Sequence, residues 1–371
     1  MLGLYLPLSG AFAEIGRDFL SGIEFARNQK RPAAGPAWQW QIIDSNITPP
    51  AAAVKEFHHT GAWVILGPVS SSRARETATA CRERQLPLIL WAPRPELCLL
   101  GRNIFQHFLN PVDQAQALAD RLHKTSNGKT ALLLPDNHFG RNFAAAFRNA
   151  TNDTGTAPTI VASIFYDPSA TDFGPAILAL QKKPAANREK QREEPDTSTD
   201  SGPPIYPFSN LILADFYPRL RLLLPQLTFH GLIQAPICGP RQLHDSRLTR
   251  ESSTALEGAL CCELACEMPE PEPRVTAWKE RYQATVGRPA SLYAIYAADT
   301  LTLLDRAWAN FTSNTAADLT QALLDLPPQP LLSGPTRVDK RGVFKKEFRF
   351  LNCKEGTWQP APPPTPAGKR H

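Results

Sequence analysis

The sequence lacks any long hydrophobic run. No apolar stretch in its 371 residues reaches the roughly 18 residues of a membrane-spanning helix. We also expect no secretory leader in this sequence, because Met1 is followed at once by the apolar stretch 2–7 and not by a basic region and a cleavage site. We therefore expect that Met1 is an added start on a fragment trimmed from a longer protein.

Dense runs of one charge are missing from the folded part as well. The net charge is +5, and the basic residues are scattered along the chain. A nucleic-acid surface needs a basic patch or stripe, so we expect no nucleic-acid partner. Hydrophobic residues make up 42% and charged residues 20% of the chain, which is typical of a globular protein.

Motifs of catalysis and of metal binding are absent too. The sequence contains no G-x-S-x-G elbow, no G-x-G-x-x-G and no Walker loop, so we expect neither an enzyme nor a nucleotide cofactor. Its seven cysteines include Cys262-x3-Cys266, which is not a zinc spacing, and we expect no metal site. An odd number leaves at least one cysteine without an intramolecular partner; one disulfide and small buried side chains both stay open.

What the sequence does contain is a regular alternation of strands and helices. Apolar strands are predicted at 2–7, 38–44, 63–67, 86–91, 130–135, 159–166, 210–215, 231–238 and 256–262, with amphipathic helices between them. Strands that are apolar throughout suit parallel sheets covered on both faces. The chain is therefore predicted to be α/β, with two parallel sheets in succession and hence two lobes.

The end of the chain departs from this series. Helices are expected at 272–286, 291–309 and near 316–325 without strands between them, followed by a hairpin over 336–358. Two segments are expected to be unfolded, the polar insertion 182–204 and the proline-rich tail 361–368.

Five motifs in order carry a family resemblance. They are LPLSGAFAEIGRDFLSGIEFA, LGPVSSS, LPLILWAPRPEL, LLLPDNHFGRNFAAAFR and FYDPSATDF. The series resembles the type I periplasmic binding proteins, in the leucine/isoleucine/valine-binding branch with its relatives among penicillin-binding protein activators. The resemblance covers residues 2 to about 358. It implies two Rossmann-like lobes joined by three crossover hinge segments, with a ligand cleft between lobes that close on the ligand.

The resemblance also sets the expected domain boundaries. Lobe 1 is predicted to comprise 1–111 and 264–335, and lobe 2 to comprise 112–263 and 336–358. The disordered insertion then covers about 183–204 of lobe 2, and the proline-rich tail covers 359–371.

Ligands of open parallel sheets bind beyond the carboxyl ends of the strands. The residues that follow predicted strand ends, read together with the resemblance, give the expected ligand contacts: Ser9, Ser70, Ser71, Trp91, Arg94, Phe139, Asp215, Phe216 and Arg241. The resemblance implies that Ser71 accepts a ligand carboxylate at the start of a helix, where free N–H groups favour an anion. The alternative is that Ser70–Ser72 only cap that helix.

Two of these positions differ from the family pattern. Arg94 stands where a threonine is common, and Arg241 stands near the place where amino-acid binders present a carboxylate to the ligand amine. Two arginines suit an anionic ligand, although both could point to solvent, and Asp215 could still receive an amine. Aromatic residues 91, 139, 216 and 217 could form walls for the ligand or pack within their lobes.

The resulting expectation is an extracytoplasmic, periplasmic solute-binding protein. It would capture a small polar ligand, an amino acid or an anionic relative, by lobe closure and deliver it to an ABC permease in the membrane. The full-length protein could carry a lipid anchor. The alternative is a protein-interaction domain of a lipoprotein that activates a peptidoglycan synthase, which the two arginines favour.

Overall fold

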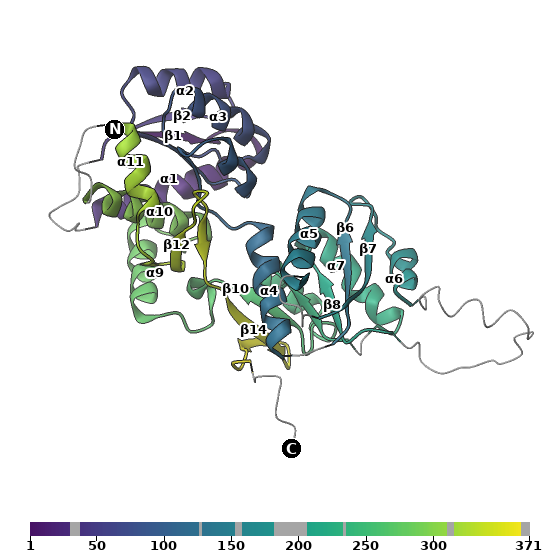
Figure 1. Ribbon diagram of the computed structural model, residues 1–371. Coiled ribbons are helices and arrows are strands. Elements are labelled where there is room, and N and C mark those ends of the chain that lie inside the picture. The colour runs from purple at the N-terminus through teal and green to yellow at the C-terminus, as the bar shows by residue number, and fades with distance from the viewer. Residues whose placement is uncertain are drawn as a thin grey trace, which may run out of the picture. The chain divides into compact units, whose positions relative to one another are not determined.

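The computed structural model describes residues 1–29, 38–125, 128–152, 158–181, 206–232, 235–309 and 315–364. The chain forms two compact units (Figure 1). Unit 1 comprises Met1–Asn110 and Leu264–Glu347, and unit 2 comprises Pro111–Glu263 and Phe348–His371. The chain therefore passes from one unit to the other three times, after Asn110, after Glu263 and after Glu347.

Unit 1 is built on a five-stranded parallel sheet in the order β2-β1-β3-β4-β5. Its strands are β1 (Leu2–Leu6), β2 (Trp40–Asp44), β3 (Val64–Leu66), β4 (Leu88–Leu90) and β5 (Ile104–Gln106). The connecting helices are α1 (Ala13–Asn28), α2 (Pro50–His59) and α3 (Ser71–Glu83). Strands β1, β3 and β4 are buried along their whole length, because α2 and α3 cover one face of the sheet and α1 the other (Figure 1).

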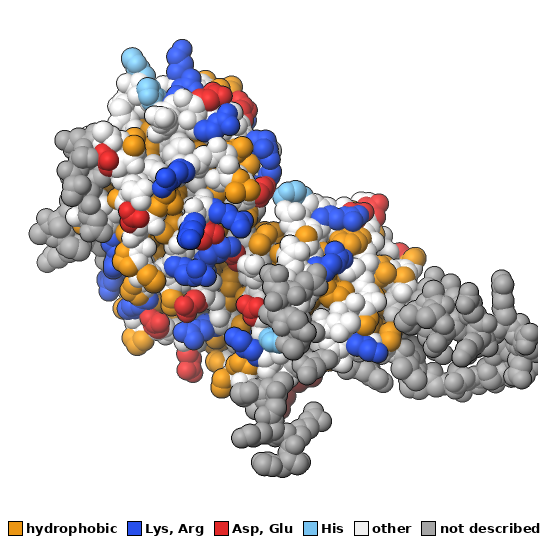
Figure 2. All heavy atoms as spheres, viewed as in Figure 1, with side chains coloured by type: hydrophobic (Ala, Val, Ile, Leu, Met, Phe, Trp, Pro, Cys, Tyr) orange, Lys and Arg blue, Asp and Glu red, His pale blue; other side chains and the backbone are white. Residues whose placement is uncertain are grey.

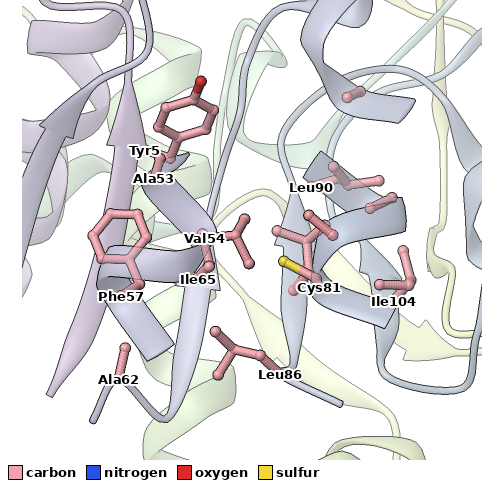
Figure 3. Packing of buried hydrophobic residues seen from close by; sticks show 14 of the residues in the cluster. Tyr5, Ala53, Val54, Phe57, Ala62, Ile65, Cys81, Leu86, Leu90 and Ile104 are labelled. Atoms are coloured by element: carbon pink, nitrogen blue, oxygen red, sulfur yellow. The ribbon is translucent and has the colours of Figure 1, made fainter. Parts of the chain in front are cut away.

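One hydrophobic core lies between the sheet and helices α2 and α3 (Figure 3). Val54 of α2 lies next to Ile65 of β3, and the ring of Phe57 packs on Gly3 of β1, while Cys81 of α3 lies near Leu90 of β4 (Figure 3). All five side chains are at most 1% exposed. Each fully buried aliphatic or aromatic side chain contributes roughly 1.5–3 kcal/mol, so this face fixes the helices on the sheet.

The second segment of unit 1 adds three helices and a small sheet. The helices are α9 (Pro273–Val286), α10 (Leu292–Ala309) and α11 (Ala316–Leu324), and the antiparallel sheet has the order β11-β12-β13. Its strands are β11 (Gln329–Leu331), β12 (Gly334–Val338) and β13 (Phe344–Lys346). The backbone N–H of Gln106 donates to the carbonyl of Gly342 over 3.0 Å, which ties this sheet to β5.

The hairpin predicted over 336–358 is corrected by this arrangement. Strand β12 pairs with both β11 and β13, and all three belong to unit 1, so the third crossing follows Glu347 and does not precede residue 336. A second hairpin, β14 (Arg349–Lys354) with β15 (Thr357–Pro360), belongs to unit 2. Because only two residues separate β13 from β14, the sequence pattern predicted one hairpin where the structure has two.

Unit 2 holds a seven-stranded mixed sheet in the order β15-β14-β10-β9-β8-β6-β7. Its other strands are β6 (Thr130–Pro135), β7 (Ile160–Tyr166), β8 (Asn210–Leu213), β9 (Ile237–Gly239) and β10 (Leu260–Glu263). Its helices are α4 (Pro111–Thr125), α5 (His138–Asn152), α6 (Gly174–Gln181), α7 (Tyr217–Phe229) and α8 (Ser246–Glu251). Strands β6 to β10 are mutually parallel, and β14 pairs with β10 in the antiparallel direction.

Most predicted elements lie within a few residues of the observed ones. Strand β9 begins at Ile237 instead of residue 231, and neither β5 nor α8 was predicted. These elements are short, so few apolar positions mark them. The predicted insertion 182–204 lies outside the described residues, and so does the tail beyond residue 364.

Both units contain the same strand–turn–helix contact. A Cβ atom on Gly16 of α1 would lie 2.0 Å from the carbonyl oxygen of Pro7, and one on Gly140 of α5 would lie 2.1 Å from that of Pro135. Only glycine permits so close an approach of helix to strand end. The first turn of each helix is therefore held directly beyond its strand.

Candidate functional site

The candidate site in unit 1 is the edge of its sheet at the carboxyl ends of the strands. Because β1, β3 and β4 are parallel, the loops that follow them lie at one edge. We call this region edge A, and define it by Ser9 after β1, Asp44 at the end of β2, Ser70–Ser72 after β3, and Arg94 after β4.

The serines of edge A stand at the start of a 13-residue helix, α3. Ser70 is the N-cap residue, and its side chain makes no capping hydrogen bond. Its hydroxyl pairs instead with that of Ser72 over 2.7 Å. The capping interpretation therefore fails for Ser70. The first-turn N–H groups and the helix dipole together form an environment suited to an anion.

Arg94 does not project freely into solvent. Its side chain is 19% exposed, its Nε donates to the Glu96 carboxylate, and its Nη1 donates to the carbonyl oxygen of Ser71 over 3.3 Å. These contacts hold the guanidinium beside the first residue of α3. A guanidinium carries five N–H donors, so these two bonds leave further donors for a ligand.

The remaining members of edge A were partly missed by sequence reasoning. Asp44 Oδ1 accepts hydrogen bonds from the backbone N–H groups of Leu8 (3.1 Å) and Asn46 (2.9 Å), and Asn46 Nδ2 donates to the carbonyl of Ser9. Although burial acts to raise the pKa of Asp44, bonds from Asn46, Ser9 and Leu8 lower it overall. Asp44 ends a predicted strand, which is the signal that could have identified it.

Trp91 was expected to contact the ligand and instead lies in the core of unit 1. Its ring is 0% exposed and stacks on Phe19 with centroids 4.1 Å apart, and its Nε1 donates to Thr300 Oγ1 over 2.9 Å. The packing interpretation is therefore the one that fits. A residue after a strand end can turn inward or outward, and the sequence pattern does not distinguish the two.

The corresponding edge of unit 2, edge B, is defined by Phe139 after β6, Asp215 and Phe216 after β8, Arg241 after β9, and Glu263 at the end of β10. Asp215 is 4% exposed; it accepts from Tyr166 Oη (2.6 Å) and from the Phe216 N–H (2.7 Å). Burial raises the pKa of Asp215, and the two hydrogen bonds only partly oppose this. Burial and the nearby carboxylate also raise the pKa of Tyr166.

Two predicted aromatic residues meet at edge B. The ring centroids of Phe139 and Phe216 are 5.1 Å apart, and Phe216 is 50% exposed. An exposed phenylalanine supported from behind by a second ring provides an apolar surface for a ligand or partner.

Arg241 is held by a residue that sequence reasoning missed. Its Nε lies 3.0 Å from Glu263 Oε1, and His244 Nδ1 lies 2.9 Å from Glu263 Oε2. Glu263 is 0% exposed, whereas the Arg241 side chain is 27% exposed. Sequence reasoning expected the cation of Arg241 in place of a carboxylate. The structure has both, because the buried Glu263 carboxylate binds the Arg241 guanidinium. Adjacent parallel strands β9 and β10 bring the two residues together.

Other classes of site are not indicated. Over the residues the structure describes, no helix is long and apolar enough to cross a membrane, and no cluster of His, Cys, Asp and Glu could hold a metal ion. The side chains of all seven cysteines are buried, and none of them forms a disulfide bond. On the face shown in Figure 2, basic side chains are interspersed with acidic and hydrophobic ones.

The comparisons with known proteins agree with this architecture. The family model of the periplasmic binding proteins matches residues 1–357. No curated protein sequence matches the chain. The chain has the type I periplasmic binding protein fold, as the motif series predicted, and it belongs to the periplasmic binding protein family.

Three solved structures illustrate the likeness of fold. A Rhodospirillum rubrum protein, provisionally assigned as a branched-chain amino acid ABC transporter, has a TM-score of 0.78 at 19% identity, covering 97% of this chain and 99% of that one. A substrate-binding protein from Desulfitobacterium hafniense in complex with leucine has a TM-score of 0.69 at 19% identity, with coverages of 97% and 99%. A solute-binding protein from Rhodopseudomonas palustris in complex with benzoate has a TM-score of 0.66 at 18% identity, with coverages of 100% and 97%.

Proposed function

We propose that the chain is an extracytoplasmic solute-binding protein that captures a small carboxylic acid for an ABC transporter. The observation that carries the proposal is the start of α3, where Ser71 and the first-turn N–H groups lie beside the guanidinium of Arg94. A helix N-terminus with an adjacent arginine suits a carboxylate. Leucine and benzoate, the solutes in two of the similar structures, share that group.

The rest of the solute is proposed to be apolar or aromatic. Phe216 is half exposed and backed by Phe139, so it offers a flat apolar surface. The charged groups at edge B already have partners within unit 2: Tyr166 donates to Asp215, and Glu263 binds Arg241. A hydrophobic carboxylic acid requires no further charge there. An amino acid would need its ammonium group to share Asp215 with Tyr166.

A thermal-shift screen of the purified chain tests the proposal. The panel contains benzoate, 3,4-dihydroxybenzoate, leucine, isoleucine, succinate and a neutral amide, benzamide. A solute that binds only the folded chain should raise the Tm by roughly 3–4 °C at a hundredfold excess over its Kd. Benzamide is the matched control, since it keeps the ring and lacks the carboxylate.

The outcomes separate the proposed functions. A shift with benzoate or leucine but not with benzamide supports carboxylate capture. A panel without any shift contradicts it, and the alternative of a protein-interaction domain is then tested by pull-down with a peptidoglycan synthase. Lobe closure is checked with the best solute by small-angle X-ray scattering, where closure predicts a smaller radius of gyration with solute than without it.

A further inference from the structure

A lysine that is not among the residues of edge A is buried in unit 1. The Lys346 side chain, at the end of β13, is 3% exposed, and its Nζ lies 4.0 Å from the carboxylate of Asp299, which is 1% exposed. Buried charges in proteins are normally paired and hydrogen-bonded, because removing them from water is costly. The surroundings of Lys346 therefore call for an explanation.

The Lys346 ammonium group has a complete set of acceptors. Its Nζ donates to Ser333 Oγ (2.7 Å), Thr336 Oγ1 (2.8 Å) and His107 Nε2 (2.9 Å). Three donors meet three acceptors, so the ammonium is fully satisfied. It also lies 4.9 Å from the centre of the Tyr296 ring, which adds a cation–π contact.

The carboxylate of Asp299 is held independently of the lysine. It accepts from the backbone N–H groups of Leu332 (2.8 Å) and Ser333 (2.9 Å) and from the Ser333 hydroxyl. Ser333 therefore contacts both members of the ion pair. We call Lys346, Asp299, His107, Ser333 and Thr336 the anchor cluster.

The anchor cluster lies where the chain leaves unit 1, before the first and the third crossings. Lys346 immediately precedes Glu347, the last residue before the third crossing, and His107 follows β5 shortly before the first crossing after Asn110. Through its hydrogen bond to His107 Nε2, Lys346 thus joins the segment before the third crossing to the segment before the first.

A hydrogen-bond chain links the anchor cluster to the end of β4. Because His107 Nε2 accepts from Lys346, its Nδ1 carries the proton and donates to Thr300 Oγ1 over 2.8 Å. Thr300 in turn donates to the carbonyl of Tyr296 (2.7 Å) and accepts from Trp91 Nε1 (2.9 Å). Trp91, which sequence reasoning placed at the ligand, therefore packs against the network that holds the crossing segments.

We propose that Lys346 is a positioning residue whose buried ammonium group ties the segment before the third crossing to the segment before the first crossing and to β12 of unit 1. A buried polar network of this kind specifies one arrangement and need not add net stability. Removal of Lys346 leaves His107 Nε2, Ser333 Oγ and Thr336 Oγ1 without this donor, so the segments that carry them should open more readily. The inference concerns the frame of unit 1 and does not depend on the identity of any solute.

Several titratable groups face Lys346: Asp299 and Tyr296 from α10, His107 after β5, and Cys266 after β10. Burial lowers the pKa of Lys346 to about 8, which Asp299 partly opposes. The unfolded state then binds more protons between pH 8 and the ordinary lysine value of 10.5, so the contribution of Lys346 to stability rises over that window. Burial and Lys346 lower the pKa of His107, consistent with its neutral form.

Hydrogen–deuterium exchange on the full chain tests the proposal, with Lys346→Met compared to Lys340→Met. Lys340 is exposed at the turn of the same hairpin and serves as the control. The proposal predicts at least tenfold faster exchange in peptides covering 104–110, 333–336 and 343–348 in Lys346→Met only, with β1 and β3 unchanged. A uniform change across unit 1, or no change in these peptides, would overturn it.

Two further measurements keep the test decisive. In urea unfolding between pH 8 and 10, the wild type should gain stability relative to Lys346→Met, and parallel curves would contradict the role of the ammonium group. If Lys346→Met does not fold, Thr336→Val removes one acceptor with little change of shape. It should accelerate exchange about threefold in the same three segments, and an unchanged pattern would again reject the proposal.

Discussion

Edges A and B occupy equivalent places in their sheets but satisfy their polar groups differently. At edge A the hydroxyls of Ser70 and Ser72 bind each other, with no other partner among the described residues, and α3 has no side-chain cap from Ser70. At edge B, Asp215 is bound by Tyr166, and Arg241 is bound by the buried Glu263. Edge A therefore leaves further guanidinium N–H donors of Arg94 for a ligand. Edge B instead combines an exposed aromatic ring with charged groups that already have partners.

The difference arises from side chains, because the backbone frame is the same. Gly16 and Gly140 bring α1 and α5 equally close to the carbonyl oxygens of Pro7 and Pro135. The turn of unit 2 is short and closed by Asn137, whose Oδ1 accepts from the Gly140 N–H over 3.0 Å. The longer turn of unit 1 exposes Phe12. The same frame thus carries two kinds of surface.

The largest effect is expected at edge B. Replacing Glu263 with alanine leaves Arg241 and His244 without their buried partner, which should lower the free energy of unfolding by about 3–5 kcal/mol. Glu96→Ala at edge A removes the partner of Arg94 from a more exposed position and should cost less than about 1 kcal/mol. Urea unfolding of both variants measures the contrast, and equal losses would refute the difference between the edges.

The shared frame is tested by Gly16→Ala and Gly140→Ala. Each added Cβ collides with a backbone carbonyl oxygen, so each variant should lose about 2–3 kcal/mol of unfolding free energy. The expected losses are similar because the two approach distances are 2.0 and 2.1 Å. A loss confined to one unit in thermal unfolding would show that the two frames are not equivalent.

A smaller effect should appear in the pH dependence of stability. Hydrogen bonds lower the pKa of Asp44 at edge A. The ionised Asp44 therefore stabilises the folded chain above pH 3.8, and this stabilisation is lost as the pH falls through the lowered pKa. Burial raises the pKa of Asp215 at edge B, so stability instead falls as the pH rises from 3.8 through the raised value.

Asp44→Asn and Asp215→Asn separate these two trends. Between pH 3 and 7, the wild type should gain stability relative to Asp44→Asn and lose stability relative to Asp215→Asn, each by about 1 kcal/mol or less. Urea unfolding at several pH values gives both differences. Two differences of the same sign would mean that the carboxylates occupy equivalent environments.

Much of the fold could be predicted from the sequence, because buried parallel strands are apolar throughout and alternate with amphipathic helices. The prediction failed where elements are short and where consecutive strands belong to different sheets. Strand β5 has three residues, and β13 is followed almost at once by β14, so neither left a distinct periodic pattern. Which sheet a strand joins depends on contacts distant in sequence, as the pairing of Gln106 with Val343 illustrates.

The candidate site could be predicted only in outline. The rule that sites follow strand ends predicts ligand contacts at Ser71, Arg94 and Asp215, but it could not state the direction of a side chain. Trp91 turned inward because Phe19 of α1 offers a stacking partner. Glu263 was missed because the predicted strand ended one residue before it.

The most direct test of carboxylate capture at edge A is calorimetric titration of the best acid from the screen into three proteins: wild type, Ser71→Ala and Ser291→Ala. The Ser291 hydroxyl accepts from the Ala294 N–H over 3.2 Å at the start of α10, so its loss should cost about 1 kcal/mol of stability without changing affinity. Ser71→Ala should instead weaken binding at least tenfold with little loss of stability. Unchanged affinity in Ser71→Ala would contradict the account.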